Sequence, residues 1–137
     1  MKILKNAALL ILILSVFAVF LAGCGKSNTV SGYVVSNESY TDKESLEAVK
    51  QPDQLAAGKD VYASVYFIES PKGMEYTAKW YLDGNEIKNE TKSMATDKHG
   101  VIVFSLEGEK APAGTLKLEI SYKDEVLSTR EITVAGE

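Results

Sequence analysis

The fold of this 137-residue chain is decided by residues 76–85, which read YTAKWYLDGN. Every second side chain before the turn is apolar: Tyr76, Ala78, Trp80 and Leu82. This period of two predicts a β-strand that buries one face, with Trp80 in the core. The strand ends at Asp83-Gly84-Asn85, residues that tolerate the positive φ angles of a tight turn. The stretch therefore predicts a strand and the hairpin that follows it.

The same period recurs on both sides of this hairpin. Alternating apolar positions predict three further strands: Val61, Ala63, Val65 and Phe67; Ile102, Phe104 and Leu106; and Leu116, Leu118, Ile120 and Tyr122. Weaker patterns predict a first strand over residues 29–35, a polar edge strand over 86–91 and a last strand over 126–134. The apolar side of this last strand switches between Leu127 and Ile132, which predicts a β-bulge.

Residues 36–59 are the least regular part of the pattern. Thr41-Asp42-Lys43-Glu44 has the form of a capping box, which predicts a short helix that ends before Pro52. A strand through Leu46 and Val49 is the alternative. Residues 55–60 then lead through a turn into the next strand.

About seven short strands, with turn signals every 8–12 residues, are typical of an immunoglobulin-like sandwich. The short turns imply antiparallel pairing. We therefore predict an all-β protein with a single immunoglobulin-like antiparallel β-sandwich over residues 29–137. Within it, the pattern does not decide the secondary structure of residues 36–59.

Two stretches resemble parts of bacterial immunoglobulin-like and fibronectin-III-like domains. Residues 79–87, KWYLDGNEI, are similar to the tryptophan strand and hairpin of these domains, and residues 112–120, PAGTLKLEI, to a later turn and strand. With residues 58–62, the similarity covers about residues 55–134. It implies the sandwich fold without the cysteine pair of antibody domains. Such domains bind proteins, bind glycans or act as spacers, and they share no catalytic residue.

The N-terminus has the features of an export signal. Lys2 and Lys5 precede an apolar run over residues 7–22. A membrane-spanning helix needs about 20 residues, so this short run with a basic start predicts a secretory signal peptide. An uncleaved anchor helix is the alternative.

Leu21-Ala22-Gly23-Cys24 resembles the lipobox of bacterial lipoproteins and contains the only cysteine of the chain. The resemblance implies a diacylglyceryl group on the Cys24 sulfur and cleavage before Cys24. Residues 1–23 are then a signal peptide and residues 24–28 a lipidated tether. The expected location is the outer face of a bacterial membrane, at the cell surface or in the periplasm. An ordinary signal with a stray thiol is the alternative.

The charge excludes one class of partner. Loss of residues 1–23 removes two lysines and no acidic residue, which takes the formal net charge from −4 to about −6. A negative surface argues against nucleic acid as a partner. A single cysteine forms no internal disulfide, so the fold must depend on its hydrophobic core.

No cofactor and no metal are expected. His99 is the only histidine, and the chain has no G-x-S-x-G nucleophile motif. Asp83-Gly84-Asn85-Glu86 clusters oxygen ligands but lacks the spacing of a 12-residue calcium loop. We therefore expect a protein that is not an enzyme, with a small hydrolase as an alternative.

Three tyrosines form the candidate binding face. Tyr62, Tyr66 and Tyr81 alternate with core positions, so they should point outward from the sheet. Tyrosine suits interfaces, although strands are also enriched in tyrosine for their own stability. The expected function is non-catalytic binding of an extracellular protein or an envelope glycan. The alternative is inhibition of an extracellular protease or lysozyme through the loops at residues 71–73 and 97–100.

Overall fold

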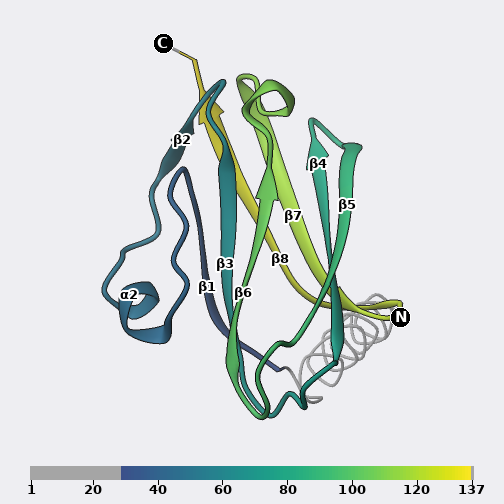
Figure 1. Ribbon diagram of the computed structural model, residues 1–137. Helices are drawn as coiled ribbons and strands as arrows, with labels where there is room; N and C mark the ends of the chain where they lie inside the picture. The colour runs from purple at the N-terminus through teal and green to yellow at the C-terminus, as the bar shows by residue number, and fades with distance from the viewer. Residues whose placement is uncertain (1–28, 137) are drawn as a thin grey trace, which may run out of the picture.

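The computed structural model describes residues 29–136, which form two packed β-sheets (Figure 1). One sheet has three strands in the order β1-β3-β6, and the other has five in the order β2-β8-β7-β4-β5. The predicted all-β, immunoglobulin-like sandwich is confirmed. The predicted signal peptide, the lipidation of Cys24 and the tether concern residues outside the described range.

The chain passes repeatedly between the two sheets, and two hairpins, β4–β5 and β7–β8, lie in the five-stranded sheet. The bounds of the elements are β1 Val30–Ser36, α2 Lys43–Glu47, β2 Gln54–Ala56, β3 Val61–Phe67, β4 Glu75–Leu82, β5 Asn85–Ser93, β6 Gly100–Leu106, the 3-10 turn η1 Gly108–Lys110, β7 Gly114–Tyr122 and β8 Glu125–Ala135. Among these residues no helix is long and apolar enough to cross a membrane.

The structure has eight strands rather than about seven. The additional strand is β2, which pairs in parallel with β8 and corrects the expectation of purely antiparallel pairing. Three residues are too few to show a period, and the partner of β2 lies about 80 residues away in the sequence. Residues 55–60 therefore contain the end of a strand as well as the predicted turn.

The core lies between the sheets and uses the predicted alternating positions. Val61, Ala63, Val65 and Phe67 are fully buried, as is Trp80. The Phe67 and Tyr76 rings stack across the sheets with centroids 3.9 Å apart. Leu82 is only half-buried, because it lies at the hairpin end of its strand, where the sheets no longer cover it.

The predicted hairpin and bulge are both confirmed. Asp83 and Gly84 have φ angles of 48° and 89°, as the two-residue turn between β4 and β5 requires. In the β7–β8 pair, Ile120 lies opposite Ser128 and Ser121 opposite Val126, so Leu127 is the extra residue of a bulge. This bulge explains the switch in the apolar side of β8.

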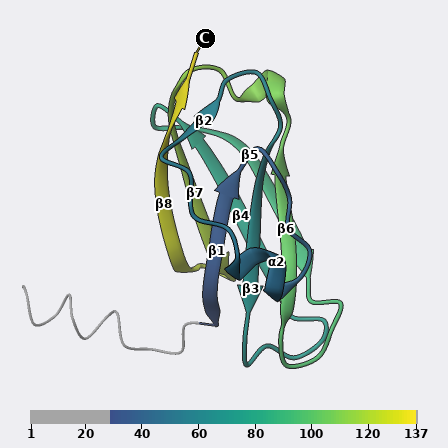
Figure 2. The ribbon, with the colours of Figure 1, turned by 90° about the vertical axis from the view of Figure 1, so that its left-hand side faces the viewer.

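Residues 37–53 cross the outer face of the three-stranded sheet, where Figure 2 shows α2 in front of β3. The predicted helix is present, but its N-cap is Asp42 rather than Thr41: the Asp42 carboxylate accepts a hydrogen bond from the Ser45 N–H at 2.8 Å. The alternative strand through Leu46 and Val49 is wrong, because Leu46 is buried from the helix. This cover also buries Ser64 on the outward side of β3.

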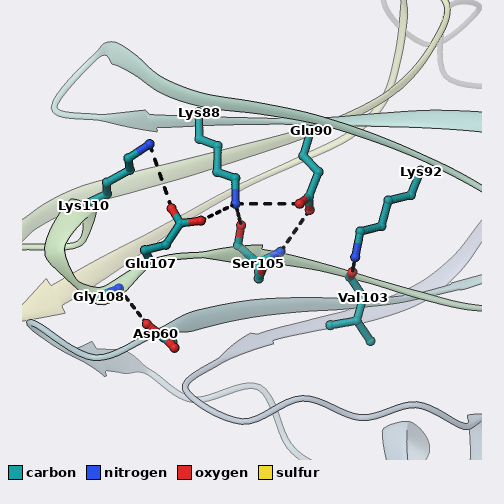
Figure 3. A network of polar contacts seen from close by, with 9 residues as sticks. All are labelled: Asp60, Lys88, Glu90, Lys92, Val103, Ser105, Glu107, Gly108 and Lys110. Carbon is teal, nitrogen blue, oxygen red and sulfur yellow. Dashed lines mark hydrogen bonds and ion pairs between the residues drawn. The ribbon is translucent and has the colours of Figure 1, made fainter.

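Side chains close the open edge of β6. Lys88 donates to the Ser105 carbonyl at 2.6 Å, and Lys92 donates to the Val103 carbonyl at 2.7 Å (Figure 3). The Glu90 carboxylate accepts the Ser105 N–H at 3.2 Å. These three residues alternate on β5, so one strand places them along the β6 backbone in the positions that a neighbouring strand would take.

The edge of β1 is closed in a similar way by Gln51. Its side-chain amide accepts the Val35 N–H at 2.9 Å and donates to the Val35 carbonyl at 2.7 Å. Arg130 of the other sheet donates to Gln51 and to the Tyr33 carbonyl, at 2.7 and 2.9 Å. Both edges of the three-stranded sheet are thus bonded to side chains, which discourages pairing with other chains.

Candidate functional site

The structure does not bring the three candidate tyrosines together. Tyr62 and Tyr66 lie on β3 of the three-stranded sheet, whereas Tyr81 lies on β4 of the five-stranded sheet. The outward faces of the two sheets point in opposite directions, so the prediction of one tyrosine face is wrong. Period-two reasoning gives the side of a strand but not the sheet to which the strand belongs.

Tyr81 is engaged by its own sheet. Its hydroxyl donates to the Glu119 carboxylate at 3.3 Å, and the Lys117 ammonium lies 4.9 Å from its ring centroid. Partial desolvation and the charge of Glu119 raise the pKa of Tyr81. Lys117 and Glu119 also pair with each other at 3.4 Å, so this tyrosine belongs to a cross-strand polar cluster.

Tyr66 lies in a different setting, between two hollows on the outer face of the three-stranded sheet. A hollow of about 270 Å³ separates it from the side of α2 that carries Leu46, with Gln51 at its border. A second hollow of about 420 Å³ lies between it and the loop at residues 94–99. Tyr66 and Lys43 line both hollows, which we call the Tyr66 hollows.

The ring of Tyr66 lies between a lysine ammonium and a histidine ring. The Lys43 ammonium lies 5.5 Å from its centroid, and the His99 ring lies 6.2 Å away at 55°. Lys43 also pairs with Glu47 at 3.8 Å, but both side chains are more than half exposed, so the pair is weak. The aromatic surface is thus bordered by donors that can turn toward a ligand.

The carboxylates around the hollows are held by short local bonds. Asp42 accepts both the N–H and the hydroxyl of Ser45, and the backbone bond is the chief reason why the pKa of Asp42 is lowered. Asp97 accepts the N–H groups of Lys98 and Lys72, at 3.0 and 3.3 Å. Both carboxylates are therefore fixed in place with acceptor capacity left for a ligand.

His99 is exposed in the loop that precedes β6, and its ring lies beside Tyr66. Among residues 29–136, no group of three His, Cys, Asp or Glu side chains could hold a metal ion. The Asp83 carboxylate accepts the Thr115 N–H at 2.9 Å, so it braces the turn at the site where calcium was considered.

The two loops proposed as inhibitory elements come together at one end of the sandwich. The Ser70 N–H donates to the Lys98 carbonyl at 2.8 Å, and the Gly73 N–H donates to the Met94 carbonyl at 2.9 Å. Backbone bonds therefore join the loops at residues 71–73 and 97–100 into one surface.

The sequence pointed to Tyr66 but missed its neighbours Lys43 and His99. Lys43 precedes Tyr66 by 23 residues and His99 follows it by 33, and no local pattern links these positions. They meet because the chain folds α2 and the loop at 94–99 against the same strand. The capping box at residues 41–44 was the one available signal, because it predicted that a helix begins next to Lys43.

No family model and no curated protein matches the chain. Several solved structures are similar at low identity. The CARDB domain of the PF1109 protein from Pyrococcus furiosus, solved in complex with di-metal ions, has 15% identity and a TM-score of 0.40; the match covers 82% of this chain and 100% of that one.

Two further structures show the same level of similarity. An immunoglobulin-like protein from Pseudomonas aeruginosa has 12% identity and a TM-score of 0.47, over 77% of this chain and 94% of that one. A β-glucosidase from Kluyveromyces marxianus has 12% identity and a TM-score of 0.43, over 77% of this chain but only 15% of the enzyme. At these identities the similarity concerns the fold, and no residue role transfers with it.

Proposed function

We propose that the protein is a lipid-anchored, outward-facing module of the bacterial cell envelope that binds its ligand without catalysis. The lipobox at residues 21–24 supports the anchor. The Tyr66 hollows support binding, because they combine an accessible aromatic ring with donors and fixed carboxylates. This combination is the observation that carries the proposal.

The chemistry of the hollows favours an envelope glycan as the ligand. A sugar ring presents an apolar face to an aromatic side chain and hydroxyl groups to carboxylates, amides and ammonium groups. A docked protein would need an apolar centre. Among the described residues, Val126 is the one large hydrophobic side chain that is clearly exposed, and it lies on β8, away from Tyr66.

Substitution of Tyr66 tests the site. We expect Tyr66→Ser to weaken glycan binding roughly two- to tenfold, because an aromatic contact contributes roughly 0.5–1.5 kcal/mol beyond its buried area. The probes are an array of bacterial envelope polysaccharides and peptidoglycan fragments, followed by calorimetric titration of the best hit.

Tyr62→Ser is the matched control, because Tyr62 lies on the same strand and face but outside both hollows. It should retain wild-type affinity. Equal losses in the two variants, or no loss in either, would rule out the Tyr66 hollows as the site.

Substitution of Cys24 tests the anchor. We expect Cys24→Ala protein to take up no radioactive palmitate in cells and to leave the membrane fraction, because the acylated sulfur is lost. Ser27→Ala in the tether is the control and should label normally. Palmitate labelling of the Cys24→Ala protein would contradict the proposal.

Inhibition of an extracellular hydrolase is the second candidate, supported by the joining of the loops at residues 71–73 and 97–100. Assays against lysozyme and serine proteases, with Lys72→Ala and His99→Ala variants, separate it from plain binding. Inhibition that both substitutions abolish would favour this candidate over the glycan module.

A further inference from the structure

One end of the sandwich gathers the start of the described chain and three connections. The Thr29 carbonyl accepts the Ile68 N–H at 2.8 Å, at the end of β3. We call this the Thr29 end; it comprises Thr29, the loops at residues 68–74 and 94–99, and the turn at residues 123–124. In Figure 1 the two loops and the start of β1 lie at the lower side and the turn between β7 and β8 lies to their right; Met74 and Tyr122 line two common hollows that connect them.

The opposite end carries the remaining connections and the C-terminus. The Gly58 N–H donates to the Ala111 carbonyl at 3.0 Å, and the Asp83 N–H donates to the Thr115 carbonyl at 2.9 Å. We call this the far end. Strands of seven to eleven residues, at about 3.3 Å per residue, place it about 23–36 Å from the Thr29 end.

The Thr29 end presents a surface of mixed apolar and polar side chains. Met74 and Tyr122 are half-exposed and line two hollows of about 390 and 300 Å³, the second of which also includes Thr29. Val126, which is 51% exposed, follows on β8. Tyrosine is enriched at the boundary between a membrane and water, where its ring is buried and its hydroxyl is solvated.

A lysine lies at each connection of this end: Lys72, Lys98 and Lys123. Long lysine side chains can keep their charge at phosphate level while their stems cover apolar surface. Each connection also carries one acidic residue: Glu69, Asp97 and Asp124. The charges of the three connections therefore cancel, and this end has no strong attraction of its own for anionic lipid.

The reach of the chain connects this surface to the membrane. Only five residues, 24–28, precede Thr29 after the processing expected at Cys24. Fully extended, five residues span about 17 Å, which is less than the length of the sandwich. The Thr29 end must then lie close to the bilayer.

We infer that the Thr29 end rests on the phospholipid headgroups of the membrane in which Cys24 is anchored, so that the far end points outward. The inference rests on the proposed lipid anchor and adds an orientation to it. The anchor provides the affinity for the membrane, and contact of the Thr29 end with the headgroups sets the orientation of the domain.

This orientation has a consequence for the ligand site. Tyr66 is the second-last residue of β3 and lies near the Thr29 end. The Tyr66 hollows then open sideways, a short distance above the headgroups, toward glycans that lie close to the membrane. The loops at residues 71–73 and 97–100 face the lipid, where they cannot enter the active site of a soluble hydrolase.

Single spin labels on the lipidated protein test the orientation. Cysteine is introduced at Lys72 on the Thr29 end, at Glu109 on the far end, and at the exposed Lys50 and at Lys79 on the two outer faces; the sulfur of Cys24 is blocked by its lipid. Each protein is added to phosphatidylcholine–phosphatidylglycerol vesicles that contain a nickel-chelating lipid, and relaxation of the label by headgroup nickel is measured. We expect strong relaxation at Lys72 and none at Glu109, since Glu109 lies on the far end.

The other outcomes overturn the inference. Relaxation at Lys50 or Lys79 equal to that at Lys72 would mean that the domain lies on its side, and relaxation at Glu109 would mean that it is inverted. Failure of the anchor is measured separately: the protein then does not bind the vesicles, and the free Cys24 thiol reacts with the spin label. Protein without lipid should not bind these vesicles.

Discussion

At the scale of single residues, Gly108 shows how closely two parts of the far end approach. A Cβ at this position would lie 2.5 Å from the Gly58 carbonyl oxygen and 2.9 Å from the Lys59 carbonyl carbon. The Gly108 N–H donates to the Asp60 carboxylate at 2.7 Å. The atoms in the way belong to the backbone, so they cannot turn aside as a flexible side chain would.

We expect Gly108→Ala to lower the free energy of unfolding by about 1–3 kcal/mol, the usual cost of overpacking. Urea denaturation followed by the fluorescence of Trp80 measures the change. Gly32→Ala is the control, because no atom lies within 4 Å of its Cβ. Equal stability of the two variants would show that the approach of the two segments is looser than described.

At the scale of elements, side chains of β5 cover the edge of β6. Lys88 has only 16% of its side chain exposed, and it bonds the Ser105 carbonyl together with the Glu90 and Glu107 carboxylates. The hydrogen bond from Lys88 is the chief reason why the pKa of Glu107 is lowered. The charges of this predicted polar edge strand therefore point inward to a neighbouring strand rather than only into water.

Removal of Lys88 should expose the edge. We expect Lys88→Met to lower the free energy of unfolding by about 1–3 kcal/mol, because the bonds from a charged group to the Ser105 carbonyl and to the Glu107 carboxylate are lost. The variant should also form more oligomers, since an uncovered edge invites strand pairing. Asn89→Ala, on the exposed side of the same strand, should keep wild-type stability and a monomeric light-scattering profile.

At the scale of the whole molecule, acid should weaken the sandwich through carboxylates that are bonded in the folded state. The pKa values of Asp42 and Glu107 are lowered by their partners Ser45 and Lys88. A lowered folded pKa means that the unfolded chain binds protons more tightly. The contribution of these groups is then complete above the unfolded carboxyl pKa of about 4, and it is lost as the pH falls through the lower folded value.

We therefore expect the double variant Asp42→Asn, Glu107→Gln to lose less Tm than the wild type between pH 6 and pH 3. Calorimetry at several pH values measures the two profiles. Parallel profiles would show that other carboxylates carry the acid sensitivity of the fold.

Much of the architecture could be predicted because strands and turns leave local signals. The buried sides of β3, β4, β6 and β7, the turn at Asp83 and Gly84 and the bulge on β8 all follow from patterns within a few residues. β2 could not be predicted in this way. Its three residues gain their partner only when the C-terminal strand β8 folds against them.

The sequence by itself determined the fold class, the core positions around Trp80 and, through the lipobox, an expected address at a membrane. The tertiary structure decided which surfaces exist. It separated Tyr81 from Tyr66, brought Lys43 and His99 to the Tyr66 ring, and placed Thr29 beside the loop at residues 68–74. The physical reason is that a period of two reports which side of a strand is buried, whereas a site needs side chains from distant segments. Only the packing of the two sheets brings those segments together.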